Sequence, residues 1–144
     1  MGSNGQDGQL LKRSLNDKFD KIICITRHRI IVKNEDFGQF SIFKKSDVKS
    51  IINKYRPKEI YYLATINKSS EKETTSNFEV DYKRLHAIHV LGLLNFLSAV
   101  RLHLPNCRLF YASSSLVFDG SNGVFQNENT PFSPVGLYGI TKLE

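Results

Sequence analysis

The chain has 144 residues, 40% of them hydrophobic, and a formal net charge of +6 at pH 7. This length and composition predict one globular domain and exclude a disordered chain. The basic residues are scattered, without aromatic RNA-binding motifs or a recognition helix, so we expect no nucleic-acid partner. The four histidines and two cysteines lack the spacing of metal ligands, so we expect no metal site.

No membrane segment or targeting signal is expected. The longest nearly apolar run, Val90 to Val100, is about half as long as a bilayer crossing requires. The first residues hold no apolar signal-peptide core, and Gln6 stands where an acylation signal would want Ser or Thr. Cys24 and Cys107 lie in apolar stretches, which favours buried free thiols. We therefore expect a cytoplasmic protein that does not contact membranes.

The chain opens with a glycine pattern. Gly2, Gly5 and Gly8 form G-x-x-G-x-x-G and precede leucines at helical spacing, so a glycine turn should open a helix. The β-branched, apolar run from Lys21 to Thr26 predicts a strand buried on both faces of a parallel sheet. Turn, helix and strand thus follow in Rossmann order.

The next segment allows two interpretations. Ile30 to Val32 and Phe40 to Phe43 could each be a strand, with residues 34–38 as the turn between them. We assign Phe40 to Phe43 as the third strand. Ser46 should cap a helix that runs to Lys54, and Arg56-Pro57 should end it.

The second half alternates strands and helices. We predict strands over Glu59 to Ala64 and Arg108 to Ala112, a long amphipathic helix over Val80 to Arg101, and a polar surface loop over residues 67–77. The predicted fold class is α/β: a Rossmann-type doubly wound parallel sheet with helices on both faces. Residues 1–144 would form a partial NAD(P)-binding Rossmann domain.

Glycines allow close approach of a pyrophosphate, and the helix they open directs its free N–H groups at the phosphates. NAD-selective sites usually place Asp or Glu after the second strand, where this chain has Arg27 and His28. A 2′-phosphate would suit that basic pair, so we expect NADP in preference to NAD. The alternative is that Arg27 and His28 form a solvated basic turn.

Three further residues have a characteristic spacing. Ser114 follows the predicted fifth strand, Tyr138 comes 24 residues later, and Lys142 lies at i+4 from the tyrosine. With the glycine loop, this set resembles the extended short-chain dehydrogenases/reductases, the NAD-dependent epimerase/dehydratase family. Three segments resemble the GDP-mannose 4,6-dehydratases in particular: Gly5-Gln6-Asp7-Gly8, Pro57 to Ala64, and Gln126 to Pro134.

The resemblance implies roles for these residues. Tyr138 would take a proton from a sugar hydroxyl while hydride passes to the nicotinamide. Lys142 would hold the cofactor ribose and favour the phenolate, and Ser114 would hydrogen-bond the reacting oxygen. The implied cofactor-binding residues are Gly2, Gly5, Gln6, Asp7, Gly8, Arg27, His28, Leu63, Ala64, Tyr138 and Lys142.

The resemblance also implies a reaction, an NADP-dependent GDP-mannose 4,6-dehydratase type of hydride chemistry at the sugar C4. The partner would be a nucleotide-diphosphate sugar, with GDP-mannose expected, and the parent a homodimer or homotetramer. Leu116 stands where the dehydratases carry a glutamate, and Val117 to Gly120 resembles the V-F-D-G of dTDP-4-dehydrorhamnose reductases. An epimerase or 4-keto-sugar reductase is therefore the alternative within the family.

The ends of the chain suggest a fragment. The central strand of a Rossmann sheet leads into the glycine turn, yet only Met1 precedes Gly2. We expect a sheet without its first strand, irregular unless another segment such as Ile30 to Val32 fills the gap. The substrate domain would also be missing, so a chain that binds dinucleotide and turns nothing over is the alternative from another functional class.

Overall fold

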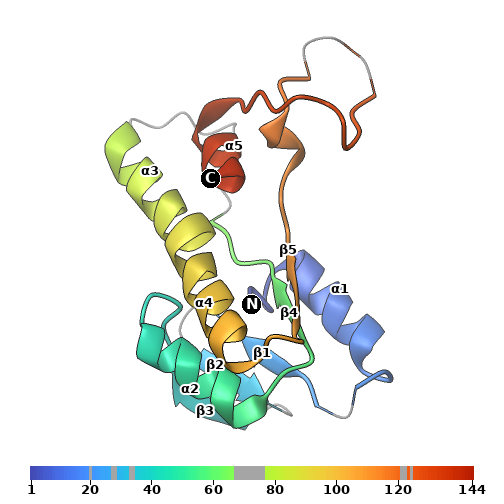
Figure 1. Cartoon of the computed structure of the whole chain (residues 1–144), viewed down its shortest axis with the longest axis vertical. Coiled ribbons are helices and arrows are strands. Elements are labelled where there is room, and N and C mark those ends of the chain that lie inside the picture. Colours follow the sequence, from blue (N-terminus) through green and yellow to red (C-terminus); the bar gives the residue numbers. More distant parts are fainter. Residues whose placement is uncertain (20, 27–28, 33–34, 67–76, 121–122, 124) are drawn as a thin grey trace.

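The computed structural model describes residues 1–19, 21–26, 29–32, 35–66, 77–120, 123 and 125–144. It is a mixed α/β structure (Figure 1). The helices are α1 (Gln6–Leu15), α2 (Lys45–Tyr55), α3 (Phe78–His86), α4 (Leu93–His103) and α5 (Gly136–Leu143), with a π-helical turn η1 (Ala87–Gly92) and a 3₁₀ turn η2 (Ser115–Val117). The strands are β1 (Ile23–Ile25), β2 (Arg29–Val32), β3 (Glu35–Gln39), β4 (Glu59–Tyr62) and β5 (Arg108–Tyr111).

The strands form two sheets. β4 and β5 pair in parallel, with Glu59 opposite Arg108 and Tyr62 opposite Tyr111, as the Rossmann prediction requires. β1, β2 and β3 form an antiparallel sheet, which that prediction does not contain. The prediction of a parallel sheet is therefore correct for β4 and β5 and wrong for β1, β2 and β3, which pair antiparallel.

The predicted third strand is misplaced. β3 covers Glu35–Gln39, where we expected a turn, and Phe40 to Phe43 is not a strand. Phe40 is buried with its ring centroid 6.4 Å from that of Phe96, while the Ser41 N–H donates to Asp47 Oδ2 at 3.0 Å. These contacts turn the segment into the start of α2 instead of extending it along a sheet.

The start of α2 also differs from the prediction. Lys44 is the N-cap residue, and no side chain caps the helix there. Ser46 lies inside the first turn, where its hydroxyl contacts the Asp47 carboxylate at 3.4 Å. The predicted helix end is confirmed, because Arg56 adopts a left-handed conformation with φ of 42° directly before Pro57.

The first two residues connect the two sheets. The Met1 ammonium group donates to the Tyr61 carbonyl at 2.8 Å, and Leu63 N–H donates to the Met1 carbonyl at 3.2 Å. Gly2 N–H donates to the Ile25 carbonyl at 3.0 Å. Met1 therefore lies between β1 and β4, and burial lowers the pKa of its ammonium group to about 6.

Ile30 to Val32 does not fill the gap beside the fourth strand, as the sequence had suggested it could. This segment forms β2 and pairs with the edge of β1 that faces away from Met1. An antiparallel pair needs only a short connection, whereas a strand that filled the gap in parallel with β1 and β4 would require a long crossover connection. Among the described residues, Met1 is what joins β1 to β4.

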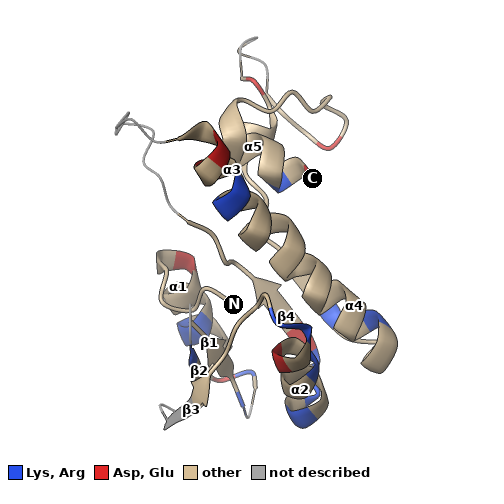
Figure 2. Ribbon diagram, turned by 90° about the vertical axis from the view of Figure 1, so that its left-hand side faces the viewer, with Lys and Arg blue, Asp and Glu red and all other residues tan. Residues whose placement is uncertain are grey.

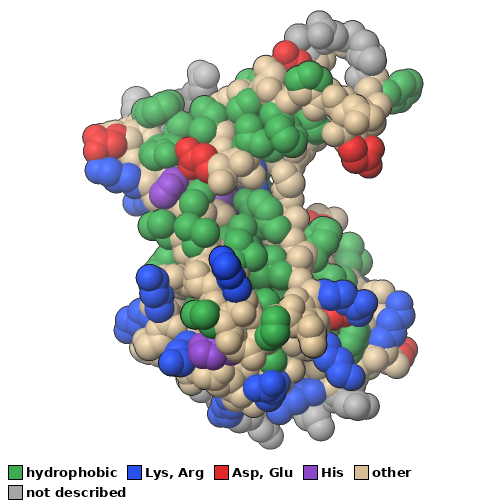
Figure 3. Space-filling view, viewed as in Figure 1, with side chains coloured by type: hydrophobic (Ala, Val, Ile, Leu, Met, Phe, Trp, Pro, Cys, Tyr) green, Lys and Arg blue, Asp and Glu red, His purple; other side chains and the backbone are tan. Residues whose placement is uncertain are grey.

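The core lies between the strands and two helices. Figures 1 and 2 agree that α2 and α4 lie on one side of β4 and α1 on the other. Ile52, Tyr62 and Phe96 are almost completely buried at the centre of this core. In the space-filling view, hydrophobic side chains also gather on the surface over α3, α4 and α5, while Lys and Arg surround the lower part of the molecule (Figure 3).

A π-helical turn interrupts the longest helix, which runs from Phe78 to His103. The Tyr62 hydroxyl donates to the Ile88 carbonyl at 2.6 Å, and a Cβ at Gly92 would lie 2.5 Å from that hydroxyl. Glycine at this position therefore lets Tyr62 reach the helix backbone. By length and composition this helix could cross a membrane, and 33% of its most apolar 18-residue stretch is buried. Phe96 and Val100 are among the residues that it buries in the core.

The Tyr62 hydroxyl should contribute measurably to stability. We expect Tyr62→Phe to lower the free energy of unfolding in urea by about 1–2 kcal/mol, because the substitution removes the partner of the Ile88 carbonyl. Tyr61→Phe is the matched control, since its hydroxyl bonds the Glu59 side chain. An equal loss of unfolding free energy in the two variants would show that the hydrogen bond to η1 stabilises the fold no more than the hydrogen bond to Glu59.

Candidate active site

The glycine loop opens α1, as the sequence predicts, and packs against the end of β4. Gly2 has φ of +74°, and a Cβ there would lie 2.8 Å from the Leu63 carbonyl oxygen and 3.1 Å from the Ala64 nitrogen. Gly8 is buried, and its Cβ would lie 2.5 Å from the Gly2 carbonyl oxygen. The first and third glycines are therefore required for close backbone packing of loop, helix and strand.

The first turn of α1 has the properties of an anion site. Gly5 is its N-cap, so this residue has no side chain that could bond the first-turn N–H groups. Gln6 and Asp7 follow in that turn and are exposed. The turn therefore presents N–H groups and the positive end of the helix dipole, which suits a phosphate.

Lys142 is buried beneath the predicted catalytic tyrosine. Its Nζ donates to the Ala112 carbonyl at 2.7 Å, just beyond β5. The same atom lies 4.6 Å from the ring centroid of Tyr111 and 5.7 Å from that of Tyr138. Burial lowers the pKa of Lys142 to about 8, so the side chain is still mostly charged at pH 7.

Ser114 is held next to the same helix by backbone packing. Its Oγ accepts the Leu116 N–H at 3.2 Å and so caps η2. The Val135 N–H donates to the Leu116 carbonyl, and a Cβ at Gly139 would lie 2.1 Å from that oxygen. Only glycine fits at 139, and η2 therefore lies directly against α5, beside Tyr138. The capping role leaves the Ser114 hydroxyl proton available to another acceptor.

Thr65 connects the glycine-loop half of the site to the catalytic half. It follows Ala64 in the chain, and its hydroxyl is hydrogen-bonded to the Tyr138 hydroxyl at 3.1 Å. Because Ala64 and Leu63 touch Gly2, the predicted cofactor residues and the predicted catalytic tyrosine meet at the end of β4. Sequence reasoning assigned no role to Thr65.

His89 is a second residue that sequence reasoning missed. It is 1% exposed and lies in η1, with its ring centroid 5.1 Å from that of Tyr138 at an interplanar angle of 80°. Nε2 lies 2.8 Å from Thr65 Oγ1, and Nδ1 lies 2.9 Å from Thr141 Oγ1. A fully buried histidine with two hydroxyl partners thus supports both the tyrosine and its helix.

The hydrogen bonds define the protonation of His89. The Thr141 hydroxyl donates to the Leu137 carbonyl at 2.9 Å, so its oxygen is free to accept from Nδ1–H of His89. Nε2 then accepts from Thr65 in a neutral ring. Burial and, to a lesser degree, the charge of Lys142 lower the pKa of His89 to about 4, in agreement with the neutral form.

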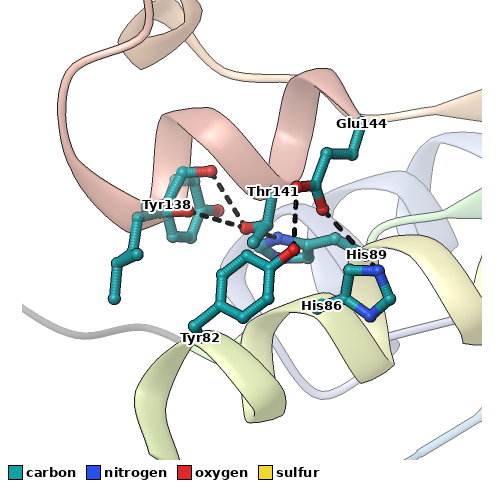
Figure 4. Close-up of polar contacts among 7 residues, drawn as sticks. Tyr82, His86, His89, Tyr138, Thr141 and Glu144 are labelled. Carbon is teal, nitrogen blue, oxygen red and sulfur yellow. Dashed lines mark hydrogen bonds and ion pairs between the residues drawn. The ribbon is translucent and has the colours of Figure 1, made fainter. Parts of the chain in front are cut away.

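Glu144 adds an outer contact between α5 and the long helix (Figure 4). Its carboxylate accepts the Tyr82 hydroxyl at 2.9 Å and lies 3.7 Å from His86 Nε2. Figure 4 shows this cluster beside the His89–Thr141 contact. Two sets of contacts, those of Glu144 and that of Thr141, therefore attach α5 to the long helix. The orientation of Tyr138 and Lys142 depends on this attachment.

The predicted site residues are therefore gathered at one place, with exceptions. Gly2 and Gly8 meet Leu63 and Ala64, while Lys142 reaches the end of β5 close to Ser114.

Among the described residues Ser114 and Tyr138 share no hydrogen bond. Arg27 and His28, on which the choice of NADP depends, lie outside the described residues. His89 could have been suspected from its place on the buried face of an apolar helix, but we had considered histidines only as metal ligands.

Comparison with protein families gives a match over the whole chain. The family model described as GDP-mannose 4,6 dehydratase matches residues 1–144. CDP-paratose 2-epimerase of Salmonella typhi is 33% identical over 85 residues, which are 59% of this chain and 23% of that protein. dTDP-4-dehydrorhamnose reductase of Aggregatibacter actinomycetemcomitans is 25% identical over 99% of this chain and 43% of its own length.

Solved structures share the fold. The dTDP-4-dehydrorhamnose reductase of Bacillus anthracis in complex with NADP superposes with a TM-score of 0.75 at 25% identity, covering 99% of this chain and 44% of that one. A hypothetical dTDP-4-dehydrorhamnose reductase from Sulfolobus tokodaii gives a TM-score of 0.77 at 21% identity, covering 99% of this chain and 48% of that one. The chain thus spans less than half the length of these relatives.

The buried, neutral His89 predicts a pH dependence of stability. An unfolded histidine takes up its proton near pH 6.5, whereas folded His89 does so only near pH 4. The unfolded state therefore binds more protons between these values, and this contribution to stability is complete above about pH 6.5 and is lost as pH falls toward about 4. Urea denaturation at several pH values should show a shallower decline for His89→Gln than for the wild type over this window. An unchanged slope would contradict a neutral, buried His89.

Proposed function

The chain belongs to the GDP-mannose 4,6 dehydratase family of the extended short-chain dehydrogenases/reductases. We propose that it is the cofactor-binding half of an NADP-linked enzyme that acts on a nucleotide-diphosphate sugar. One observation carries the proposal. Tyr138, with Lys142 beneath its ring, is hydrogen-bonded through Thr65 to the strand end that packs on the glycine loop.

The residues present suit a dinucleotide. A Cβ at Gly2 or Gly8 would collide with neighbouring backbone atoms, so only glycines allow the backbone to pack this closely. The first turn of α1 offers N–H groups for a pyrophosphate. Lys142 has two further ammonium hydrogens with which to hold the ribose hydroxyls. Relatives solved with NADP and with NADPH support NADP over NAD, although another relative was solved with NAD.

Tyr138, Lys142 and Ser114 have chemical roles consistent with their surroundings. NADP would supply the hydride acceptor or donor when bound. Lys142 is mostly charged at pH 7, and its Nζ lies 5.7 Å from the centroid of the Tyr138 ring. Tyr138 would take the proton from the sugar hydroxyl. Ser114 keeps its hydroxyl proton for the reacting oxygen because its Oγ only accepts from Leu116 N–H.

Three reactions are candidates within this function. GDP-mannose 4,6-dehydration is favoured by the family model that matches residues 1–144. Reduction or epimerisation is favoured by Leu116, which is 46% exposed next to Ser114 and cannot transfer the proton that loss of water requires. Relatives named as a reductase and an epimerase support the same alternative.

Cofactor binding can be tested directly on residues 1–144. We expect the chain to bind NADPH about tenfold or more tightly than NADH in a fluorescence titration. Lys142→Met should weaken NADPH binding by about tenfold, because it removes a charged donor to the ribose. Lys83→Met is the control, since Lys83 pairs with Glu79 on the exposed face of α3. Failure to bind either nucleotide, or equal binding by the two variants, would contradict the proposed cofactor site.

The reaction can be read from the mass of the sugar. The protein is incubated with NADP and GDP-mannose, and separately with NADPH and a 4-keto sugar nucleotide. Loss of one water would establish a dehydratase, a gain of two hydrogens a reductase, and an altered stereocentre at constant mass an epimerase. Tyr138→Phe should slow any such turnover by about 100-fold or more while NADPH still binds. NADPH binding without any turnover would contradict the enzymatic part of the proposal and identify a binding-only chain.

A further inference from the structure

The hydrogen bonds around Tyr138 begin on the backbone of its own helix. The Thr141 hydroxyl donates to the Leu137 carbonyl at 2.9 Å and lies 3.3 Å from the Tyr138 carbonyl, so its proton is directed at the backbone of α5. The Thr141 oxygen therefore accepts from Nδ1–H of His89, which lies 2.9 Å away (Figure 4). Because the ring is neutral, Nε2 of His89 has no proton and requires a donor.

Thr65 supplies this donor. Its hydroxyl has one proton and two acceptors within reach, His89 Nε2 at 2.8 Å and the Ile66 carbonyl at 3.4 Å. The shorter contact has the geometry of the stronger hydrogen bond. His89 is 1% exposed, and a buried ring nitrogen that lacked its donor would be costly. The Thr65 proton therefore goes to His89 and is not available to Tyr138.

The Tyr138 hydroxyl is then the donor in its contact with Thr65. The two hydroxyl oxygens lie 3.1 Å apart, and the Thr65 oxygen keeps lone pairs that accept the phenol proton. Thr65 is exposed and Tyr138 is half-buried, so a ligand can reach the phenol oxygen. With its proton directed at Thr65, this oxygen offers lone pairs to the ligand.

Ser114 has the opposite hydrogen-bonding character. Its Oγ already accepts the Leu116 N–H at 3.2 Å, and that contact does not use the hydroxyl proton. The turn that holds Ser114 packs on α5 at Gly139, next to Tyr138. One side of the site therefore offers a hydrogen-bond donor, and the other side offers an acceptor.

We propose that Thr65 and His89 are positioning residues that direct the Tyr138 proton toward the protein, so that the site selects a sugar that presents a hydroxyl group over one that presents a carbonyl. A hydroxyl can donate to Tyr138 and accept from Ser114 at once. A carbonyl can only accept, so it would leave its lone pairs facing those of Tyr138.

This preference rests on the proposed function and narrows it. Dehydration and epimerisation with a nicotinamide cofactor begin with the oxidation of a sugar hydroxyl, whereas reduction begins with a ketone. The hydrogen bonds of Thr65 and His89 therefore favour the first two reactions over the third.

The ring nitrogens of His89 test the direction of these hydrogen bonds on residues 1–144 without any ligand. In the nitrogen-15 NMR spectrum at pH 7, Nδ1 should be protonated and Nε2 unprotonated. Thr65→Val removes the donor and should shift the Nε2 resonance, while Thr65→Ser should restore it. Thr130→Val is the matched control, because the Thr130 hydroxyl bonds Asn127 N–H in another loop. A protonated Nε2, or an Nε2 resonance that Thr65→Val leaves unchanged, would overturn the proposal.

Sugar selection is measured with GDP-6-deoxymannose and its 4-keto form, which differ only at C4. The hydroxyl form is paired with NADPH and the keto form with NADP, so no hydride can pass and calorimetry reports binding alone. We expect the hydroxyl form to bind about tenfold or more tightly than the keto form. Thr65→Val should reduce this ratio to about twofold or less, because it frees the Tyr138 proton, and Thr65→Ser should restore the ratio.

The outcomes separate this preference from the proposed function. If NADPH binds but the two sugars bind equally, the keto form binds more tightly, or neither binds, the sugar preference is overturned while the cofactor site stands. If NADPH does not bind, the proposed function fails, and the His89 resonances still decide the direction of the hydrogen bonds.

Discussion

The segment that leaves β4 has to touch the glycine loop without a side chain between them, and most of the site depends on that contact. Gly2 lies so close to Leu63 and Ala64 that a Cβ could not be accommodated. One residue later, Thr65 reaches Tyr138. Three consecutive residues therefore fix the distance between the place for a pyrophosphate and the proposed proton-transfer group, and a shift of β4 would move both.

The buried side chains of His89 and Lys142 stabilise this arrangement because each of them has a hydrogen-bond partner. His89 would be costly to bury alone, but Thr65 and Thr141 satisfy both ring nitrogens. Lys142 is likewise buried with the Ala112 carbonyl as acceptor and aromatic rings on its flank. The π-helical turn brings His89 to this position, and Tyr62 bonds that turn from the core. The geometry of the site is thus connected to the packing of the central helix.

The predicted site residues lie close together in the structure, whereas the predicted sheet is only partly correct. Gly2, Gly8, Ser114, Tyr138 and Lys142 follow fixed spacings, and the structure places them around the ends of β4 and β5. Phe40 was assigned to a strand because the same short apolar run can form either an edge strand or a buried turn. The contact between Phe40 and Phe96, which the sequence does not show, distinguishes the two structures. No spacing pattern links His89 with Thr65, because the two residues meet through tertiary packing alone.

The two sheets also show that local sequence patterns predict strands but not the direction in which the strands pair. β-branched residues predict strands at Ile23–Ile25 and Arg29–Val32, but the direction of pairing depends on the length of the connection and on what borders each edge. Gly2 bonds to Ile25 on one side of β1, and β2 pairs with the other side. The result is an antiparallel hairpin attached to a parallel pair, with the proposed catalytic residues near the ends of β4 and β5.

The central claim is that one site spans the glycine loop and the strand end beside Tyr138. Amide chemical shifts of residues 1–144, recorded by NMR during a titration with NADPH, test it most directly. The account predicts that the amides of Gly5 to Gly8 and of Leu63 to Thr65 shift together along one binding curve, with Tyr138 and Lys142 following the same curve. Shifts confined to one of these segments, or different affinities for the two, would contradict a single site.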